Sequence, residues 1–347
     1  MQIRVSVQTS ARLHLGFLDL NGGLGRHFGS FGLAIDRPVT ALSIFHAREA
    51  SVEGPEAVRA AAHIAALRRH LNLSATYGVR IEEAIPTHAG LGSGTQLAFA
   101  LAAGLRRLEG LPEDFASDAL LLQRGGRSGI GAALFSRGGL VVDGGHGSQT
   151  RLPPVLCHLP FPEDWRIILV MDSAFSGVHG AEERAAFAAL PQFPAAAAAD
   201  ICHRLLMQAL PALAEQDLAQ FGQAVGHIQV ILGDYFAPAQ GGARYTSASV
   251  AEVMGRLAHF GAQGIGQSSW GPTGFAFVAS DDEAQRLVRL VQEERRAQKT
   301  EAAAGDPVLV VCKAVNQGAR IASNSASRDS WNSENQPGTQ DLRQGIN

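Results

Sequence analysis

The sequence predicts an α+β fold in two domains. Segments typical of strands and of helices alternate along the chain, but few form clean β–α–β repeats, which favours sheets with helices packed on them in two layers. Prolines at 153–154 and 160–162 separate two such sets of segments and mark the boundary. We therefore expect a first domain over residues 1–160 and a second over residues 161–320. Residues 321–347 are rich in Ser, Asn, Gln and Gly, and we expect a disordered polar tail because they carry too little apolar surface to order themselves.

Hydrophobic periodicity and breaker residues place the elements. A mostly apolar run at 165–171 predicts a buried strand, and leucines at helical spacing predict a helix over 97–108. The other strands are expected at residues 3–8, 30–35, 40–46, 79–82, 139–143, 274–279 and 307–312. The other helices are expected at residues 57–70, 112–123, 132–135, 181–190, 200–213, 218–232, 247–260 and 282–298.

Composition narrows the class of protein. The formal net charge of −3 argues against nucleic acid as a partner, and 46% hydrophobic with 18% charged residues is typical of a globular enzyme. Cys157, Cys202 and Cys312 have neither metal-ligand nor disulfide spacing, which predicts a reduced, cytoplasmic setting. The strand-like N-terminus does not resemble a signal peptide, and Gly, Pro or charge interrupts every apolar stretch, so no membrane span is expected.

A glycine-rich loop stands between the strand at 79–82 and the helix at 97–108. It consists of Gly90, Leu91, Gly92, Ser93, Gly94 and Thr95. Glycines allow close backbone approach, and the first amides of a helix, at its positive dipole end, form an anion site to which the two hydroxyls add donors. The loop therefore predicts a phosphate or pyrophosphate site, with a plain glycine turn that caps a buried helix as the alternative.

Two further glycine-rich segments follow, at 124–131 and 264–274. Arg124 and Arg127 make the first of them cationic, and arginine forks bind phosphate or carboxylate in bidentate fashion. Structural salt bridges are the alternative role for these two arginines. The second segment combines glycines, two serines and Trp270, which is more typical of a functional loop than of a flexible connector.

Residues 86–95 resemble the phosphate loop of the GHMP superfamily, named for galactokinase, homoserine kinase, mevalonate kinase and phosphomevalonate kinase. The resemblance implies a ribosomal-S5-like N-terminal domain, a ferredoxin-like C-terminal domain and an active site in the cleft between them. The kinases of this superfamily usually place an aspartate near the second glycine-rich turn, where it helps to activate the acceptor hydroxyl. Residues 126–131 contain no acidic residue, so an ATP-dependent small-molecule kinase is only the runner-up interpretation.

Within that superfamily the chain resembles the β-ribofuranosylaminobenzene 5′-phosphate synthase family. The resemblance is carried by residues 11–20, 233–236, 240–242 and 264–273. It implies condensation of phosphoribosyl pyrophosphate with 4-aminobenzoate or 4-hydroxybenzoate, with release of CO2 and pyrophosphate, in tetrahydromethanopterin biosynthesis. It also implies Mg2+ as cofactor and a homodimer. A non-catalytic sugar-phosphate sensor is the alternative from another class of protein.

That reaction suggests roles for individual side chains. Asp19 is predicted to hold the metal or to stabilise the ribosyl cation, and Arg26 to bind phosphate or carboxylate, because the intervening turn would bring both to one cleft. An ordinary turn residue and a surface charge are the alternatives for this pair. Trp270 is predicted to stack on the aromatic substrate or simply to pack. The remaining substrate-binding candidates are His14, His88, Arg124, Arg127, Ser128, Gln267, Ser268 and Ser269.

Overall fold

The computed structural model describes residues 2–172, 174, 177, 180–298 and 306–326. In this part of the chain the first domain is built on a seven-stranded sheet with the path β11-β1-β2-β4-β3, to which β5 is added beside β2 and β6 beside β5. All pairs are antiparallel except the parallel pair β3 and β4. The strands are β1 (Gln2–Asp19), β2 (Phe28–His46), β3 (Ser51–Glu53), β4 (Tyr77–Glu83), β5 (Leu140–Asp143), β6 (Val155–Leu159) and β11 (Arg320–Ala326).

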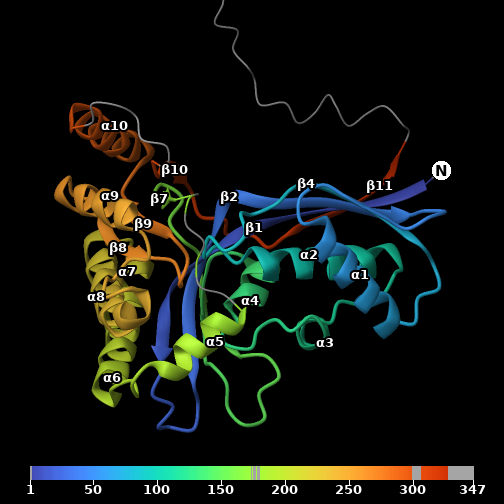
Figure 1. Cartoon of the computed structure of the whole chain (residues 1–347), viewed down its shortest axis with the longest axis horizontal. Helices are drawn as coiled ribbons and strands as arrows, with labels where there is room; N and C mark the ends of the chain where they lie inside the picture. Colours follow the sequence, from blue (N-terminus) through green and yellow to red (C-terminus); the bar gives the residue numbers. More distant parts are fainter. Residues whose placement is uncertain (1, 173, 175–176, 178–179, 299–305, 327–347) are drawn as a thin grey trace, which may run out of the picture.

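Four helices pack on one face of this sheet (Figure 1). They are α1 (Ala57–His70), α2 (Ser93–Leu108), α3 (Phe115–Leu121) and α4 (Ile130–Arg137). The central helix α2 is buried along most of its length and lies on β1 and β2. It approaches the sheet closely at Gly104, where a Cβ atom would come within 2.9 Å of Ile44 Cδ1. The predicted phosphate loop, residues 90–95 at the start of α2 and called the phosphate loop below, is therefore anchored to the core of the domain.

The second domain contains a four-stranded sheet in the order β10-β7-β9-β8. Its strands are β7 (Arg166–Met171), β8 (Gln263–Gln267), β9 (Thr273–Val278) and β10 (Val308–Cys312). Its helical segments are α5 (Gly180–Ala189), α6 (Ala195–Arg204), a π-helical segment (Leu205–Ala209), α7 (Leu210–Ala214), α8 (Leu218–Phe236), a 3₁₀ turn (Ala237–Gln240), α9 (Ala248–His259) and α10 (Asp281–Gln298).

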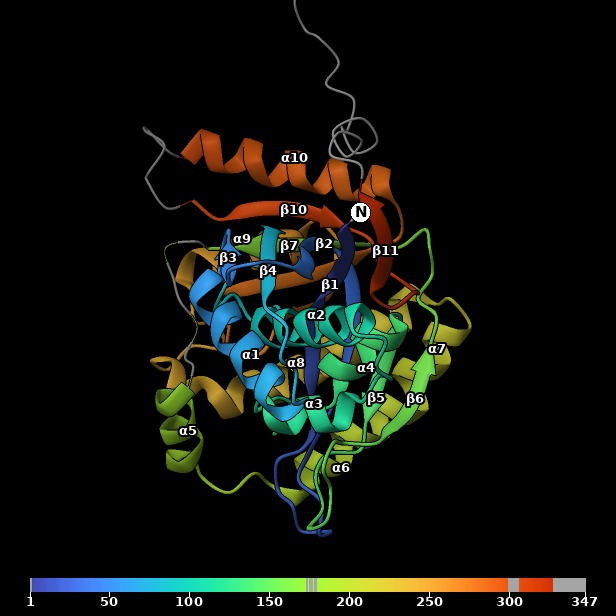
Figure 2. The same ribbon diagram turned by 90° about the vertical axis from the view of Figure 1, so that its right-hand side faces the viewer.

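The second sheet is covered on both faces. Side chains of α9 and α10 share a core with Ile168 and Val170 of β7, whereas α8 packs against the alternate residues Ile167 and Leu169. The α8 core also includes β1 and β2 residues such as Leu15, so one hydrophobic core joins the two domains. Figure 2 shows α10 lying along β10, a strand of this sheet.

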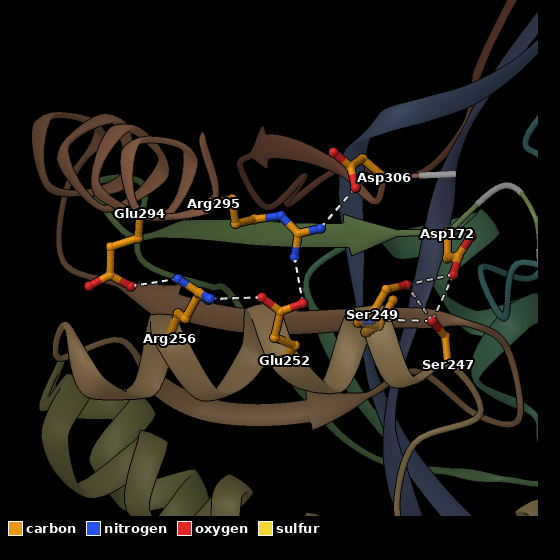
Figure 3. A network of polar contacts seen from close by, with 9 residues as sticks. Asp172, Ser247, Ser249, Glu252, Arg256, Glu294, Arg295 and Asp306 are labelled. Carbon is orange, nitrogen blue, oxygen red and sulfur yellow. Dashed lines mark hydrogen bonds and ion pairs between the residues drawn. The ribbon is translucent and has the colours of Figure 1, made fainter. Parts of the chain in front are cut away.

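A polar network ties the outer layer together (Figure 3). Glu252 accepts from Arg256 and Arg295, and these arginines also reach Glu294 and Asp306. At the other end of α9, the carboxylate of Asp172 accepts from the hydroxyls of Ser247 and Ser249, 2.7 and 2.9 Å away. Since Ser247 is the N-cap of α9, Asp172 fixes the start of that helix against the end of β7.

Most expected elements are confirmed, with two differences. The expected strands 3–8, 30–35 and 40–46 belong to two long strands, β1 and β2, which continue through irregularities in their pairing. The strands β3, β6, β8 and β11 were missed because they are short or polar.

The expectation of a disordered tail over 321–347 is wrong for its first six residues. Residues 320–326 form β11, which pairs with residues 2–8 of β1 along the sheet edge. An edge strand is held by backbone hydrogen bonds and needs few apolar side chains, so composition does not reveal it. Residues 327–347 lie outside the described part of the chain.

Candidate active site

A cavity of about 370 Å³ lies where the three glycine-rich segments meet. Its walls come from the inner part of β1, the phosphate loop, the second glycine-rich turn and the turn between β8 and β9. Of the predicted site residues, it is lined by His14, His88, Gly90, Gly92, Ser93, Gly94, Thr95, Arg124, Arg127, Ser128, Ser269 and Trp270. Arg12, Phe17 and Gln123 also line it, and the sequence analysis did not single them out.

The phosphate loop presents backbone amides to this cavity. Helix α2 begins at Ser93, and its N-cap Gly92 has a left-handed φ of 77° and no side chain that could cap the helix. The first amides of a helix generally lack a partner within it. Here Thr95 N donates to Gly92 O at 3.1 Å, so the amides of Ser93 and Gly94 are the candidate donors for an anion. A Cβ atom at Gly92 would lie 2.9 Å from Arg12 Nε, which shows how closely the cation approaches the loop.

The phosphate loop is locked to the turn after β8. Ser268 is fully buried; its Oγ donates to Gly90 O at 2.8 Å and accepts from His14 N at 3.0 Å. A Cβ atom at Gly271 would lie 2.2 Å from Gly90 N, so only glycine fits there. Ser268, predicted to bind substrate, therefore holds three segments together and does not line the cavity.

The cavity is cationic. Arg12, Arg124 and Arg127 line it, and Arg124 comes close enough to the loop that a Cβ atom at Gly94 would lie 3.1 Å from its Nη1. Burial, and secondarily the nearby charge of Arg59, lowers the pKa of Arg124. In the part of the chain that the structure describes, its buried Nε has no hydrogen-bond partner. An anion that enters the cavity would offset this cost of burial.

His14 stays neutral at the inner end of the cavity. Burial, followed by the charges of Arg12 and Arg127, holds the pKa of His14 well below its ordinary value. Within the described ranges, its Nε2 and the Nε1 of Trp270 are buried and have no hydrogen-bond partner. These two ring nitrogens could therefore form hydrogen bonds with a bound ligand. Neither side chain adds a positive charge to the cavity.

A second, smaller cavity of about 30 Å³ adjoins the first. His14, Phe17, Ser269 and Trp270 line both of them, and Leu232 and Phe236 of α8 make the smaller one apolar. The predicted residue Gln267 lines this second cavity, where its side chain bonds to Thr246 and Gln240. The side chain of Leu91, another predicted site residue, is buried in the core and lines neither cavity. Its carbonyl oxygen accepts a hydrogen bond from Arg12 N at 3.0 Å.

Asp143, which was not among the predicted site residues, positions the second glycine-rich turn. This fully buried carboxylate accepts from the hydroxyls of Ser30 and Ser128 and from the amides of Gly129 and Gly145. Its only sequence signal is an acidic residue at the end of an apolar strand. With its oxygens occupied in this way, Asp143 supports the turn and is not available as a base.

The structure does not bring Asp19 and Arg26 to this cavity. Both belong to the tip of the β1–β2 hairpin, and neither is among the lining residues. Asp19 Oδ1 accepts from the amides of Asn21 and Gly22 at 2.7 and 3.0 Å. Arg26 donates from Nε and Nη2 to the carbonyl oxygens of residues 144 and 145, each at 2.7 Å. These contacts are those of turn residues, and a catalytic role for the pair stays a prediction.

The donor set does not fit a Mg2+ ion held by the protein alone. Mg2+ is usually bound through one or two carboxylates together with substrate phosphates. Within the described ranges, the lining of the larger cavity contains no carboxylate, and no group of three or more His, Cys, Asp or Glu side chains is placed to bind a metal. Asp19, the predicted ligand, lies at the hairpin tip.

The fold and the loop define the class of protein. The chain matches the GHMP kinases N terminal domain over residues 56–139 and the GHMP kinases C terminal family over residues 209–296. Homoserine kinase from Cytophaga hutchinsonii has a similar structure, with a TM-score of 0.64, 16% identity and coverage of 92% of this chain and 97% of that one. Mevalonate diphosphate decarboxylase from Staphylococcus aureus gives a TM-score of 0.62 at 13% identity, with 93% and 98% covered. The chain therefore has the GHMP kinase fold.

Two relatives narrow this class, and both are named β-ribofuranosylphenol 5′-phosphate synthase. The relative from Archaeoglobus fulgidus is 33% identical over 79% of this chain and 88% of its own length. The relative from Methanothermobacter thermautotrophicus is 30% identical over 84% of this chain and 94% of its own length. The chain belongs to this family of enzymes. Among the described residues, no helix is both long and apolar enough to cross a membrane.

Proposed function

We propose that this protein is a β-ribofuranosylphenol 5′-phosphate synthase, which condenses phosphoribosyl pyrophosphate with a para-substituted benzoate and releases CO2 and pyrophosphate. The names of its relatives favour 4-hydroxybenzoate over 4-aminobenzoate as the acceptor, because the product is then a phenol. The resemblance places this step in tetrahydromethanopterin biosynthesis.

The observation that carries the proposal is the charge of the cavity. Three arginines and the amide-rich start of α2 face a space with no lining carboxylate in the described part of the chain. Such a site suits a donor that carries several negative charges and a leaving group whose charge grows in the transition state. It also suits the carboxylate of the acceptor.

The reaction needs no base. The bond between the ribosyl carbon and the pyrophosphate oxygen breaks, and its electron pair leaves with pyrophosphate. The ring carbon that bears the carboxylate forms the new C–C bond. The bond to the carboxyl carbon then breaks, returns its electrons to the ring and releases CO2. The protein contributes position and fixed positive charge, from the loop amides and Arg124 at the leaving group. His14, whose pKa is lowered by burial, adds no positive charge.

A kinase is less well supported. Phosphoryl transfer to an alcohol uses a positioned residue that accepts the hydroxyl proton. The acidic residue nearest to the second turn, Asp143, is fully buried and already accepts four hydrogen bonds.

We propose that Mg2+ binds together with the donor and is not held by the protein alone. The lining offers only neutral oxygen donors, such as the hydroxyls of Ser93 and Thr95, so we propose that the ion arrives on the pyrophosphate oxygens. A homodimer and a cytoplasmic location stay predictions.

The test is incubation with phosphoribosyl pyrophosphate, Mg2+ and carboxyl-labelled 4-hydroxybenzoate or 4-aminobenzoate, with released CO2 counted. We expect CO2 and pyrophosphate in equal amounts. Binding of phosphoribosyl pyrophosphate without release of pyrophosphate or CO2 would indicate a sensor. ATP-dependent phosphorylation of an added alcohol would indicate a kinase.

A further inference from the structure

Phe187 of α5 occupies the indole face of Trp270. The two rings are stacked, with centroids 4.6 Å apart and an interplanar angle of 14°. The guanidinium carbon of Arg127 lies over the same phenyl ring, 5.1 Å from its centroid. A half-buried phenyl ring is thus held by an indole and a cation at the edge of the candidate active site.

The rest of its surroundings is aromatic. Phe17, Phe28 and Phe236 meet the Phe187 ring edge-on, at interplanar angles of 82°, 89° and 83°. Phe17 and Trp270 line both cavities, Arg127 the larger one and Phe236 the smaller one. Phe187 is not among the lining residues of either cavity, but it packs against side chains that line both.

Phe187 comes from the edge of the molecule. Figure 2 shows α5 standing apart from the layered body, and among residues 185–190, whose side chains are described, Ala186, Phe187 and Leu190 pack against the core. Trp270 Nε1 and His14 Nε2 are buried and have no hydrogen-bond partner among the described residues. A planar ring with a polar group could replace the phenyl ring and also satisfy such atoms, which phenylalanine cannot do.

We propose that the face of Trp270 covered by Phe187 is the subsite for the aromatic ring of the acceptor, and that the acceptor displaces Phe187 when it binds. The proposal rests on the proposed function and assigns the ring of a benzoate to one place. The ring stacks on Trp270, and its carboxylate lies toward the arginines of the larger cavity, beside the pyrophosphate donor.

Phe187 and the acceptor then compete for one face of Trp270. This competition determines whether each substitution raises or lowers the affinity for the acceptor. Removing the phenyl ring strengthens acceptor binding, and removing the indole weakens it. An aromatic pair accounts for about a two- to tenfold change in affinity. The donor contacts glycine loops and arginines and should keep its KM.

The experiment compares Phe187→Ala, Phe187→Leu and Trp270→Ala with the wild type. Equilibrium dialysis with labelled 4-hydroxybenzoate gives the Kd without donor, and CO2 release at saturating phosphoribosyl pyrophosphate gives the acceptor KM. We expect F187A to lower both about two- to tenfold, F187L to lower them less, and W270A to raise them. In the W270A background, F187A should have no further effect. Phe260→Ala is the matched control, because Phe260 is another half-buried phenyl ring that lies beyond α9 and away from both cavities.

The outcomes separate the two proposals. A wild type that releases no CO2 overturns the proposed function, while dialysis with F187A still decides the subsite. A raised or unchanged acceptor Kd in folded F187A and F187L would show that Phe187 is a wall of the site, and would overturn the inference.

Discussion

The phosphate loop and the tip of the β1–β2 hairpin are both glycine-rich turns beside charged residues, yet they are built differently. In the loop, other parts of the chain crowd the glycines: a Cβ atom at Gly90 would lie 2.2 Å from Ser268 O. At the tip, Gly25 has the same φ as Gly90, 80°, but among the described residues no atom beyond its chain neighbours lies within 4 Å of its Cβ position. At Gly90 glycine allows close approach between distant segments, whereas at Gly25 it serves backbone conformation alone. The short contact at Gly23 of the tip, 2.6 Å, is with the side chain of Asn21, two residues away. Crowding thus distinguishes an assembled site from an exposed turn.

The largest contrast is expected between Gly92→Ala and Gly25→Ala. Both place a side chain in the left-handed region, so each should destabilise the fold by about 1 kcal/mol. Only G92A also pushes on Arg12 and narrows the cavity. We expect its kcat/KM for phosphoribosyl pyrophosphate to fall about a hundredfold, as when a positioned donor of an anion site is lost. G25A should stay within twofold, and equal losses in the two variants would erase the distinction.

Arginine substitutions test the same contrast through charge. Arg124 is half-buried beside the loop, whereas Arg26 is exposed and bonds to carbonyl oxygens of a neighbouring turn. Removing a partly buried charge that pairs with a ligand costs about 2 kcal/mol or more, or about thirtyfold. We expect R124Q to raise the donor KM by about this factor and R26Q by threefold or less. Initial rates at varied donor concentration give both KM values. A larger increase in KM for R26Q than for R124Q would contradict the contrast between the two turns.

Asp19→Asn decides how far the hairpin tip contributes to the reaction. Asparagine keeps an oxygen that can accept from the amides of Asn21 and Gly22, so the turn should survive. From its place outside the cavity we expect turnover to fall less than tenfold. A carboxylate at the ribosyl cation or on the metal would instead cost about a hundred- to a thousandfold. CO2 release by a folded D19N variant distinguishes the two, and the larger loss would restore Asp19 to the site.

The smallest effect concerns pH. The pKa of His14 is lowered in the folded state, so the unfolded chain binds its proton first as the pH falls. The associated stability is complete above about pH 6.5 and is lost as the pH falls toward the folded-state value, by at most about 1.4 kcal/mol per unit. His63, with a pKa lowered to about 4 by burial and by Arg124 and Arg59, contributes in the same window. Urea unfolding at pH 7 and 5 should show a smaller pH dependence for H14Q, and an unchanged dependence would refute a neutral buried His14.

Local sequence was informative where local chemistry decides the structure. The helix at 57–70 and the start of the phosphate-loop helix follow from periodicity and glycine punctuation. The polar strand β11 could not be predicted in this way, because it forms by pairing with β1, at the other end of the described chain.

The sequence by itself determined the α+β class, the phosphate loop and a cationic second turn, because each depends on residues close together in the chain. Tertiary structure alone decided which charged residues share the cavity. It turned Arg12 toward the loop, left Arg26 at the hairpin tip, and set Asp143 beneath Ser128. It also stacked Phe187 on Trp270 across 83 positions of sequence. Such neighbours are selected by packing and by burial of charge, which depend on the whole fold and not on local spacing.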